Sequence, residues 1–237
     1  MLSLICVLGL AAGNAHNDTY DAEADKKTPH KAWRPIPSGV IHPGSAMNAA
    51  YFMYGMIVII ALTLSFLVAV VTIWYVFLLH LYNEKARQEW GLGGHIVASL
   101  LTTATVILPM AYVGSLALFP LALGLFLLEV GREIIVSIPD TDEGVNTLPN
   151  QIGVEKAARL SRVYTLGWCL IFPIQPLLTL AIGELYLLTG ALWGVCLFLA
   201  PLYAKEKEKP RVWIKFQVLT KIPMVVFVVA LLVEVWL

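Results

Sequence analysis

Residues Ala46–Tyr82 read AMNAAYFMYGMIVIIALTLSFLVAVVTIWYVFLLHLY and hold no Asp, Glu, Lys or Arg over 37 positions. One helix of that length would be about 55 Å long, whereas the hydrocarbon core of a bilayer is about 30 Å thick. Basic clusters flank the run at 26–34 and at 85–87. Because cytoplasmic loops carry the excess of Lys and Arg, both ends should face the cytoplasm. We therefore expect two antiparallel helices that turn near Leu64–Ser65.

The same argument extends along the chain. A second helix pair is expected within Gly94–Val130, a third within Val163–Tyr203, and a single span over Phe216–Leu237. The residues expected to mark the turns are Pro109, Gly114 and Pro120 in the second pair, and Gly183–Glu184 in the third.

Only 14% of the residues are charged and 59% are apolar, against about 25% and 45–50% in soluble domains. The sequence thus predicts an all-α, polytopic transmembrane bundle with about seven full spans, and a formal net charge of zero gives no sign of a nucleic-acid partner.

Residues 1–15 are apolar but too few to cross a bilayer. No Lys or Arg stands before the apolar part of this stretch, whereas a secretory signal peptide begins with a basic region, so a signal peptide is disfavoured. The apolar segment instead continues into an acidic one, as the cytoplasmic end of a transmembrane helix would. We expect a single domain over 1–237 that contains this N-terminal half span and lacks some preceding sequence.

The acidic segment carries Asp18, Asp21 and Asp25, which are spaced by three and four residues. On a helix these positions share one face, where like charges repel unless a cation lies between them. Mg²⁺ prefers carboxylate oxygens and shares its coordination shell with substrate phosphates, and Asn17 could add a neutral oxygen. The alternative interpretation is a solvated helix end in a loop.

A basic and proline-rich stretch follows directly. Lys26, Lys27 and Lys31 precede Arg34, which opens the turn-rich loop Arg34-Pro-Ile-Pro-Ser-Gly39. Carboxylates for a metal ion and cations for phosphate oxygens, side by side at a membrane face, favour a diphosphate ligand.

The pattern Asn17-Asp18-x-x-Asp21-x-x-x-Asp25, followed by Arg34–Gly39, resembles the first aspartate-rich motif of the UbiA prenyltransferase superfamily. Gly144–Pro149 resembles the Gly-x-x-Thr-Leu-Pro stretch that follows the second motif of that superfamily. Asp140 matches a family aspartate, and Asp142 and Glu143 could serve as others. The second motif departs from the family at Val136-Ser137, where Lys-Asp is usual, and several residues before Gly144 are missing. Two interpretations stay open: a remodelled active loop, or a weakened or inactive enzyme.

The resemblance implies a bundle around a central apolar cavity with a polar cytoplasmic cap. It implies Mg²⁺-dependent transfer of a prenyl group from an isoprenyl diphosphate to a small aromatic quinone precursor or a glycerol-phosphate lipid. The enzyme would be integral to the cell (inner) membrane, with its active site on the cytoplasmic side. The implied metal ligands are Asp18, Asp21, Asp25, Asp140 and Asp142. The implied catalytic residues are Asp18, Asp21, Arg34 and Lys85. The implied diphosphate ligands are Asn17, Arg34, Lys85, Arg87 and Arg132.

Several of these residues have a simpler interpretation. Lys85 and Arg87 fit an ordinary cytoplasmic basic cluster, and Arg132 could pair with Glu133 to orient the acidic loop. Tyr20, Tyr51 and Tyr54 could face an allylic cation or anchor the helices at the membrane interface. A transporter is the remaining alternative. It would require ionisable residues within the spans, and the candidates, all near predicted span ends, are His80, Glu129, Glu184 and Glu234.

Overall fold

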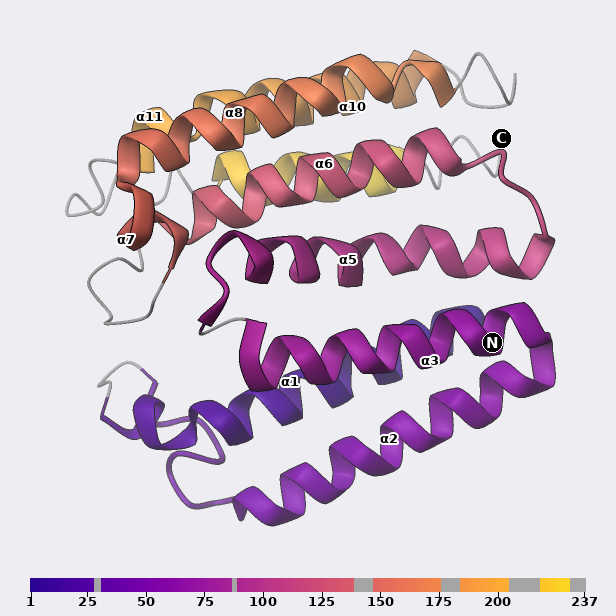
Figure 1. The fold of residues 1–237 in the computed structure, drawn as a ribbon, viewed down its shortest axis with the longest axis vertical. Helices are drawn as coiled ribbons and strands as arrows, with labels where there is room; N and C mark the ends of the chain where they lie inside the picture. Colours follow the sequence, from indigo (N-terminus) through magenta and orange to yellow (C-terminus); the bar gives the residue numbers. More distant parts are fainter. Residues whose placement is uncertain (28–30, 87–88, 139–146, 176–183, 205–217, 231–237) are drawn as a thin grey trace. The chain divides into compact units, whose positions relative to one another are not determined.

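The computed structural model describes the whole chain except residues 28–30, 87–88, 139–146, 176–183, 205–217 and 231–237, and every regular element in the described residues is helical (Figure 1). The chain forms two compact units. One comprises Met1–Ala86 with Ile107–Gly114, and the other comprises Arg87–Val106 with Ser115–Leu237. Because the regular elements of the described residues are all helical, the all-α prediction is confirmed.

The first unit contains α1 (Leu2–Lys26), α2 (Pro43–Leu64), α3 (Phe66–Leu81) and the π-helical turn η1 (Tyr82–Ala86). Ser65 separates α2 from α3. Its backbone is extended, and its side chain accepts a hydrogen bond from the Val68 N–H at 3.1 Å. Ser65 is thus both the end of one helix and the N-cap of the next. This confirms the turn that helix length and the flanking basic clusters predicted near Leu64–Ser65.

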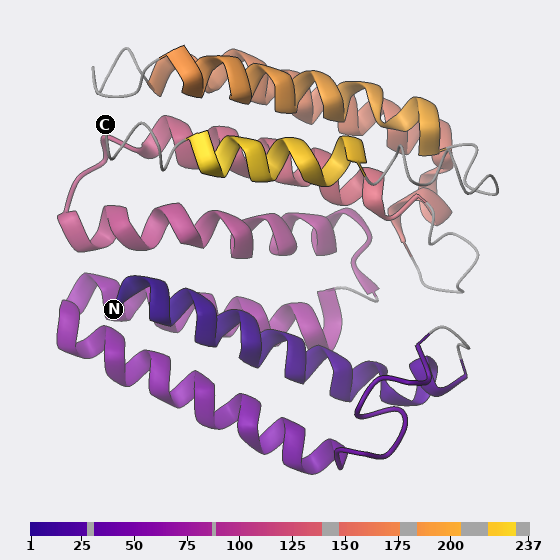
Figure 2. The ribbon, with the colours of Figure 1, turned by 180° about the vertical axis from the view of Figure 1, so that it is seen from behind.

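Helix α1 packs against both α2 and α3 (Figures 1 and 2). Two glycines allow the close approach to α3. A Cβ atom on Gly9 would lie 2.5 Å from Tyr75 Cε1, and one on Gly13 would lie 2.9 Å from Leu79 Cδ2. The Asn83 side chain, on η1, donates a hydrogen bond to the Gly13 carbonyl at 3.3 Å. Larger residues at these glycines would push α1 away from α3.

Helix α5 (Leu92–Val113) ends at Gly114, whose φ of +67° suits a residue without a Cβ atom. Helix α6 (Phe119–Val136) then begins with Pro120 in its first turn. Gly114 and Pro120 therefore mark the turn of the second helix pair, as predicted. Pro109 lies inside α5 and marks no turn.

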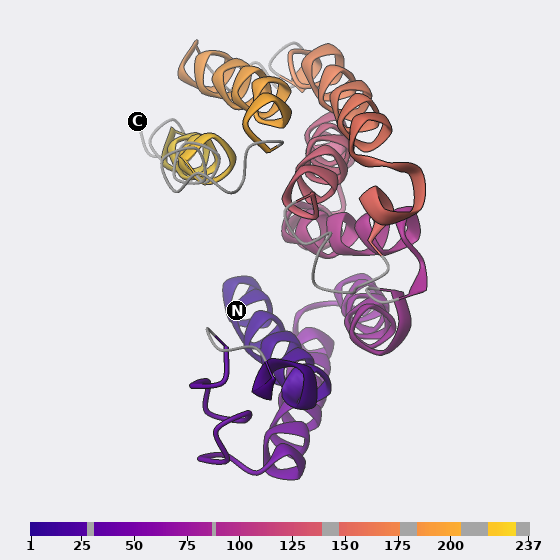
Figure 3. The same ribbon diagram turned by 90° about the vertical axis from the view of Figure 1, so that its left-hand side faces the viewer.

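The second unit packs α6 on α8 (Val154–Ile171), which follows the short helix α7 (Leu148–Ile152). Helices α10 (Glu184–Leu199) and α11 (Pro201–Ala204) and the helix Val218–Ala230 complete its described part (Figure 3). Aromatic rings form the core. The Trp168 and Phe172 rings stack at 4.8 Å, and the Trp193 and Phe227 rings lie 5.4 Å apart.

Helix α8 begins earlier than predicted. The third pair was expected to start at Val163, but α8 starts at Val154, after Gly153 with φ +86°. Lys156, Arg159 and Arg162 thus lie on a helix and not in a loop. The periodicity explains this. Ala157, Ala158 and Ser161 are buried, so an apolar stripe holds α8 against its neighbours while the charged residues point outward.

Among the described helices, three are long and apolar enough to cross a bilayer: Pro43–Leu64, Phe66–Ala86 and Leu92–Val113. Glu184–Leu199 and Val218–Ala230 are apolar but shorter. The total of about seven spans, and the single-domain organisation, stay predictions.

Candidate functional site

The three aspartates of the first acidic segment lie on one continuous helix, because α1 runs unbroken from Leu2 to Lys26. At about 100° per residue, Asp18, Asp21 and Asp25 fall within roughly 60° of one another around its axis. Asp25 is buried, whereas the Asp18 side chain is 36% exposed. The predicted common face is therefore present, and it runs from a buried carboxylate to an accessible one.

Arg34 joins two of these carboxylates. Its Nη1 atom lies 2.9 Å from Asp25 Oδ2 and 3.3 Å from Asp18 Oδ1. Lys31 is farther away, with its Nζ atom 4.0 Å from Asp25 Oδ1. Asn17 donates from its side-chain nitrogen to Asp21 Oδ2 at 3.3 Å. The predicted residues thus meet in two groups on α1: Arg34 with Asp18 and Asp25, and Asn17 with Asp21.

The loop that carries Arg34 is held by its own backbone. The Ser38 N–H donates to the Arg34 carbonyl, and the Ile41 N–H donates to the Pro35 carbonyl, each at 2.9 Å. Ile36 is buried and packs with Ala22 and Ala46. This small apolar contact fastens the loop to α1 and α2, and so places the Arg34 guanidinium over the acidic face.

These residues fit Mg²⁺. The ion prefers hard oxygen ligands and few protein carboxylates, and this face offers carboxylates at three positions and the Asn17 amide. Arg34 now neutralises part of that charge. A bound cation would share or replace this contact.

The second acidic segment is described only in part, because Asp140, Asp142, Glu143 and Gly144 lie outside the described residues. The start of α7 is described, with Leu148 and Pro149 buried. Asp140 and Asp142 therefore remain predicted metal ligands.

Arg132, at the end of α6, binds two carboxylates of its own helix. Its Nη2 atom lies 2.7 Å from Glu129 Oε2 and 2.5 Å from Glu133 Oε1. The pairing with Glu133 was predicted, but the pairing with Glu129 was not. Glu129 is fully buried, and its position three residues before Arg132 was the available signal. Its contact with Arg132 gives this buried acid a structural role and weakens the transporter alternative.

The remaining candidates lie on η1 and around His16. Lys85 is on η1, and Arg87 lies outside the described residues. The rings of Tyr20, Tyr51 and Tyr54 lie 5.4–6.0 Å from the His16 ring. Tyr54 is buried, which argues against an interface anchor. Burial and a hydrogen bond to Glu84 raise the pKa of Tyr20, so its hydroxyl remains a donor.

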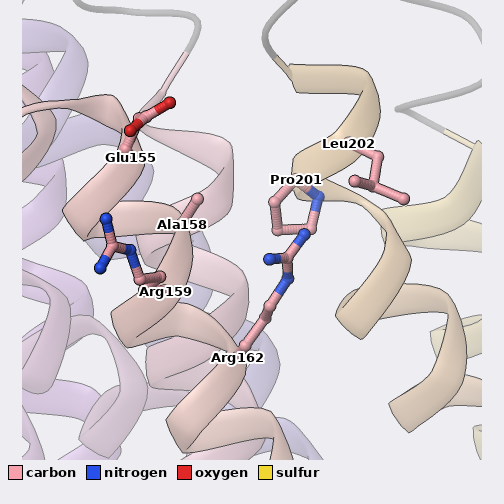
Figure 4. Close-up of a pocket in the computed structure, with 6 residues that line it drawn as sticks. All are labelled: Glu155, Ala158, Arg159, Arg162, Pro201 and Leu202. Carbon is pink, nitrogen blue, oxygen red and sulfur yellow. The ribbon is translucent and has the colours of Figure 1, made fainter.

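A shallow polar groove lies between α8 and α11 (Figure 4). Its lining residues are Glu155, Ala158, Arg159, Arg162, Pro201 and Leu202. Arg162 donates to the Phe198 carbonyl at 3.3 Å, and its guanidinium lies 5.4 Å from the centre of the Phe198 ring. Of the two arginines that line the groove, Arg162 therefore contacts α10.

A model of the UbiA prenyltransferase family matches residues 1–230. The chain belongs to the UbiA prenyltransferase family. A digeranylgeranylglyceryl phosphate synthase of Hyperthermus butylicus is 32% identical over 202 residues, which cover 78% of this chain and 65% of the relative. One of Thermococcus kodakarensis is 30% identical over 243 residues, covering 98% of this chain and 84% of the relative. The chain thus spans about two thirds of the first relative and more of the second.

Solved UbiA structures share the fold. A UbiA homologue from Aeropyrum pernix superposes with a TM-score of 0.80 at 19% identity, over 99% of this chain and 88% of that one. A homologue from Archaeoglobus fulgidus, solved with GPP and Mg²⁺, gives 0.64 at 13% identity, over 96% and 87%. At these identities the likeness supports the helical fold alone.

Proposed function

We propose that this UbiA-family chain catalyses the Mg²⁺-dependent transfer of a prenyl group from an isoprenyl diphosphate to a hydroxyl of a glycerol-phosphate lipid. The observation that carries the proposal is that Asp18, Asp21 and Asp25 share one helix face, where the Arg34 guanidinium contacts Asp18 and Asp25. The names of the relatives support the lipid acceptor. The GPP and Mg²⁺ in the Archaeoglobus fulgidus homologue support the donor and the ion.

The reaction breaks the bond between the first prenyl carbon and the diphosphate oxygen, and the bonding electrons leave with the diphosphate. The acceptor hydroxyl oxygen forms an ether bond to that carbon, and its proton passes to the released diphosphate. Mg²⁺, when bound, supplies Lewis-acid neutralisation of the leaving group. Asp18, Asp21 and Asp25 would hold it with Asn17, and Asp140 and Asp142 are the proposed ligands of a second ion.

Arg34 has two successive tasks in this proposal. Without substrate it neutralises Asp18 and Asp25, which otherwise repel each other on one face. With substrate, its planar fork can turn part of its donor set to a phosphate oxygen, a group that arginine binds in bidentate fashion. Lys85 and Arg87 are proposed as further cations for the diphosphate. The apolar helices keep water from the allylic cation.

The side of the membrane on which the active site lies is inferred from the distribution of basic residues. The basic clusters around this site support a cytoplasmic active face, with both lipid substrates supplied by the membrane. A quinone precursor was the other acceptor class that the sequence left open. The relatives favour the lipid, whereas no described residue selects an aromatic acceptor.

The test is a product assay on the purified chain in lipid nanodiscs. Labelled geranylgeranyl diphosphate is offered with geranylgeranylglyceryl phosphate or with 4-hydroxybenzoate. We expect a labelled ether lipid and diphosphate release only with Mg²⁺ and only with the lipid acceptor. Transfer to 4-hydroxybenzoate instead would overturn the acceptor assignment, and no transfer to either would support an inactive family member.

A further inference from the structure

His16 presents an unpartnered nitrogen in the interior of the first unit. The side chain is fully buried on α1. Its Nδ1 atom lies 3.2 Å from the Tyr54 hydroxyl, but in the described part of the chain its Nε2 atom has no hydrogen-bond partner. A buried nitrogen without a partner costs about 1–3 kcal/mol, so it calls for an explanation.

Two further ligand-type side chains lie close to His16. His80 lies at the end of α3, and its Nε2 atom is 3.0 Å from Glu84 Oε2 on η1. The His16 and His80 rings are 5.4 Å apart, and one donor atom from each of His16, His80 and Glu84 lies within 4.8 Å of the others. Helix α1 and the distant segment formed by α3 and η1 thus bring two imidazoles and a carboxylate together.

We propose that His16, His80 and Glu84 form a binding site for a divalent transition-metal ion such as Zn²⁺. Two histidines and one glutamate are a ligand set of known zinc sites, and imidazole favours such ions over Mg²⁺. Tetrahedral coordination with bonds of about 2.0–2.1 Å separates ligand atoms by about 3.3 Å. The side chains therefore need to close by about 1.5 Å at most, which side-chain rotation can supply.

Two of the three ligands, His16 and Glu84, have outer hydrogen-bond partners. Tyr54 holds the Nδ1 atom of His16, and the Tyr20 hydroxyl donates to Glu84 Oε1 at 3.0 Å. Metal sites typically fix their ligands through such outer partners. Binding at the His16 Nε2 atom requires the Nδ1 proton to be donated to the Tyr54 oxygen, because a neutral imidazole has one donor and one acceptor nitrogen.

This site is distinct from the aspartate cluster. At about 100° per residue, His16 and Tyr20 lie on the side of α1 opposite Asp18 and Asp25. That side is the one that Gly9 and Gly13 bring against α3. The inference therefore does not depend on the proposed transferase activity, and it is tested without any substrate.

The probe is Zn²⁺ alone, added to the metal-free full chain in detergent, with Co²⁺ as a spectroscopic substitute. We expect one Zn²⁺ per chain, a visible Co²⁺ absorption typical of low coordination number, and a thermal unfolding midpoint that rises with Zn²⁺ concentration. His80→Gln and Glu84→Gln should each weaken Zn²⁺ binding by more than about 100-fold, since loss of an outer partner alone costs 10–100-fold. Tyr54→Phe removes only an outer partner of His16 and should weaken Zn²⁺ binding by about 10–100-fold.

Two variants serve as matched controls. His42→Asn removes an exposed histidine but keeps an acceptor for the Gly44 N–H that His42 now caps, and Asp21→Asn alters the aspartate cluster. Both should bind Zn²⁺ as tightly as the unmodified chain. Circular dichroism confirms that every variant is folded. The proposal is wrong if stoichiometric binding is absent, or if His80→Gln and Glu84→Gln leave it unchanged; a loss in Asp21→Asn would place the ion in the aspartate cluster.

Discussion

Arg34 and Arg132 each bind two carboxylates, but they do so in different surroundings. Arg34 reaches from a loop to Asp18 and Asp25, with both it and Asp18 more than one third exposed. Arg132 binds Glu129 and Glu133 of its own helix, and Glu129 is fully buried. Asp25 is also buried, so of the two Arg34 contacts only the one with Asp18 can be exchanged for a ligand at little cost, because breaking a contact with a buried charge is expensive. We therefore propose that Arg34 exchanges its Asp18 contact for the substrate and that Arg132 stabilises the fold.

The largest effect is expected from Arg132→Met. It leaves Glu129 buried without its cation, which should lower the free energy of unfolding by about 3–5 kcal/mol. Thermal unfolding in detergent measures this, and the double variant Glu129→Leu with Arg132→Met should recover much of the loss. A single variant that keeps its stability but loses turnover would instead make Arg132 a diphosphate ligand.

The second largest effect is expected from Asp21→Asn. It replaces a proposed Mg²⁺ ligand by a neutral isostere that still accepts hydrogen bonds. By analogy with the loss of other preorganised electrostatic groups, turnover should fall by about 10²–10³-fold. The unfolding midpoint should change little, which separates this residue from Arg132. Unchanged Mg²⁺-dependent turnover in this variant would remove Asp21 from the metal site.

Arg34→Gln should have an intermediate effect. Losing one charge-assisted contact to the diphosphate costs about 1.5–3 kcal/mol. This cost corresponds to a fall of roughly 10–100-fold in kcat/KM for the isoprenyl diphosphate. Arg34→Lys should restore only part of it, because an ammonium cannot replace the fork. If the lysine variant were fully active, a positive charge without arginine geometry would suffice.

Lys31→Ala should show the smallest effect. Its Nζ atom is 4.0 Å from Asp25, and pairs of this kind contribute about 0.2–1 kcal/mol. Steady-state kinetics should therefore change less than about fivefold. A loss as large as that of Arg34→Gln would mean that total positive charge, and not the Arg34 contact, organises the cluster.

The sequence was sufficient for features that depend on local pattern. Helix length and the basic clusters placed the turn at Leu64–Ser65, and the aspartate spacing placed three carboxylates on one face of α1. The start of α8 was missed because the apolar run begins only at Val163, while an amphipathic helix also tolerates Lys156 and Arg159 on its outer face.

Contacts between distant segments were beyond that reasoning. Tyr20 and Glu84 are 64 residues apart, and nothing in either segment alone indicates that they meet. The available signals were indirect: Gly9 and Gly13 on one side of α1, and a histidine and a glutamate four residues apart after an apolar helix. These indicate a close approach and a polar pair, but only the packing of α1 on α3 joins them.

The central claim is that the carboxylates of α1 hold the ion that binds the diphosphate. Mn²⁺ can substitute for Mg²⁺ and be followed by electron paramagnetic resonance, with a thiolo analogue of geranylgeranyl diphosphate that does not react. We predict that Mn²⁺ binds together with the analogue, that it shows hyperfine coupling to phosphorus, and that Asp18→Asn and Asp21→Asn abolish this signal. The same phosphorus-coupled signal in both variants would contradict the account.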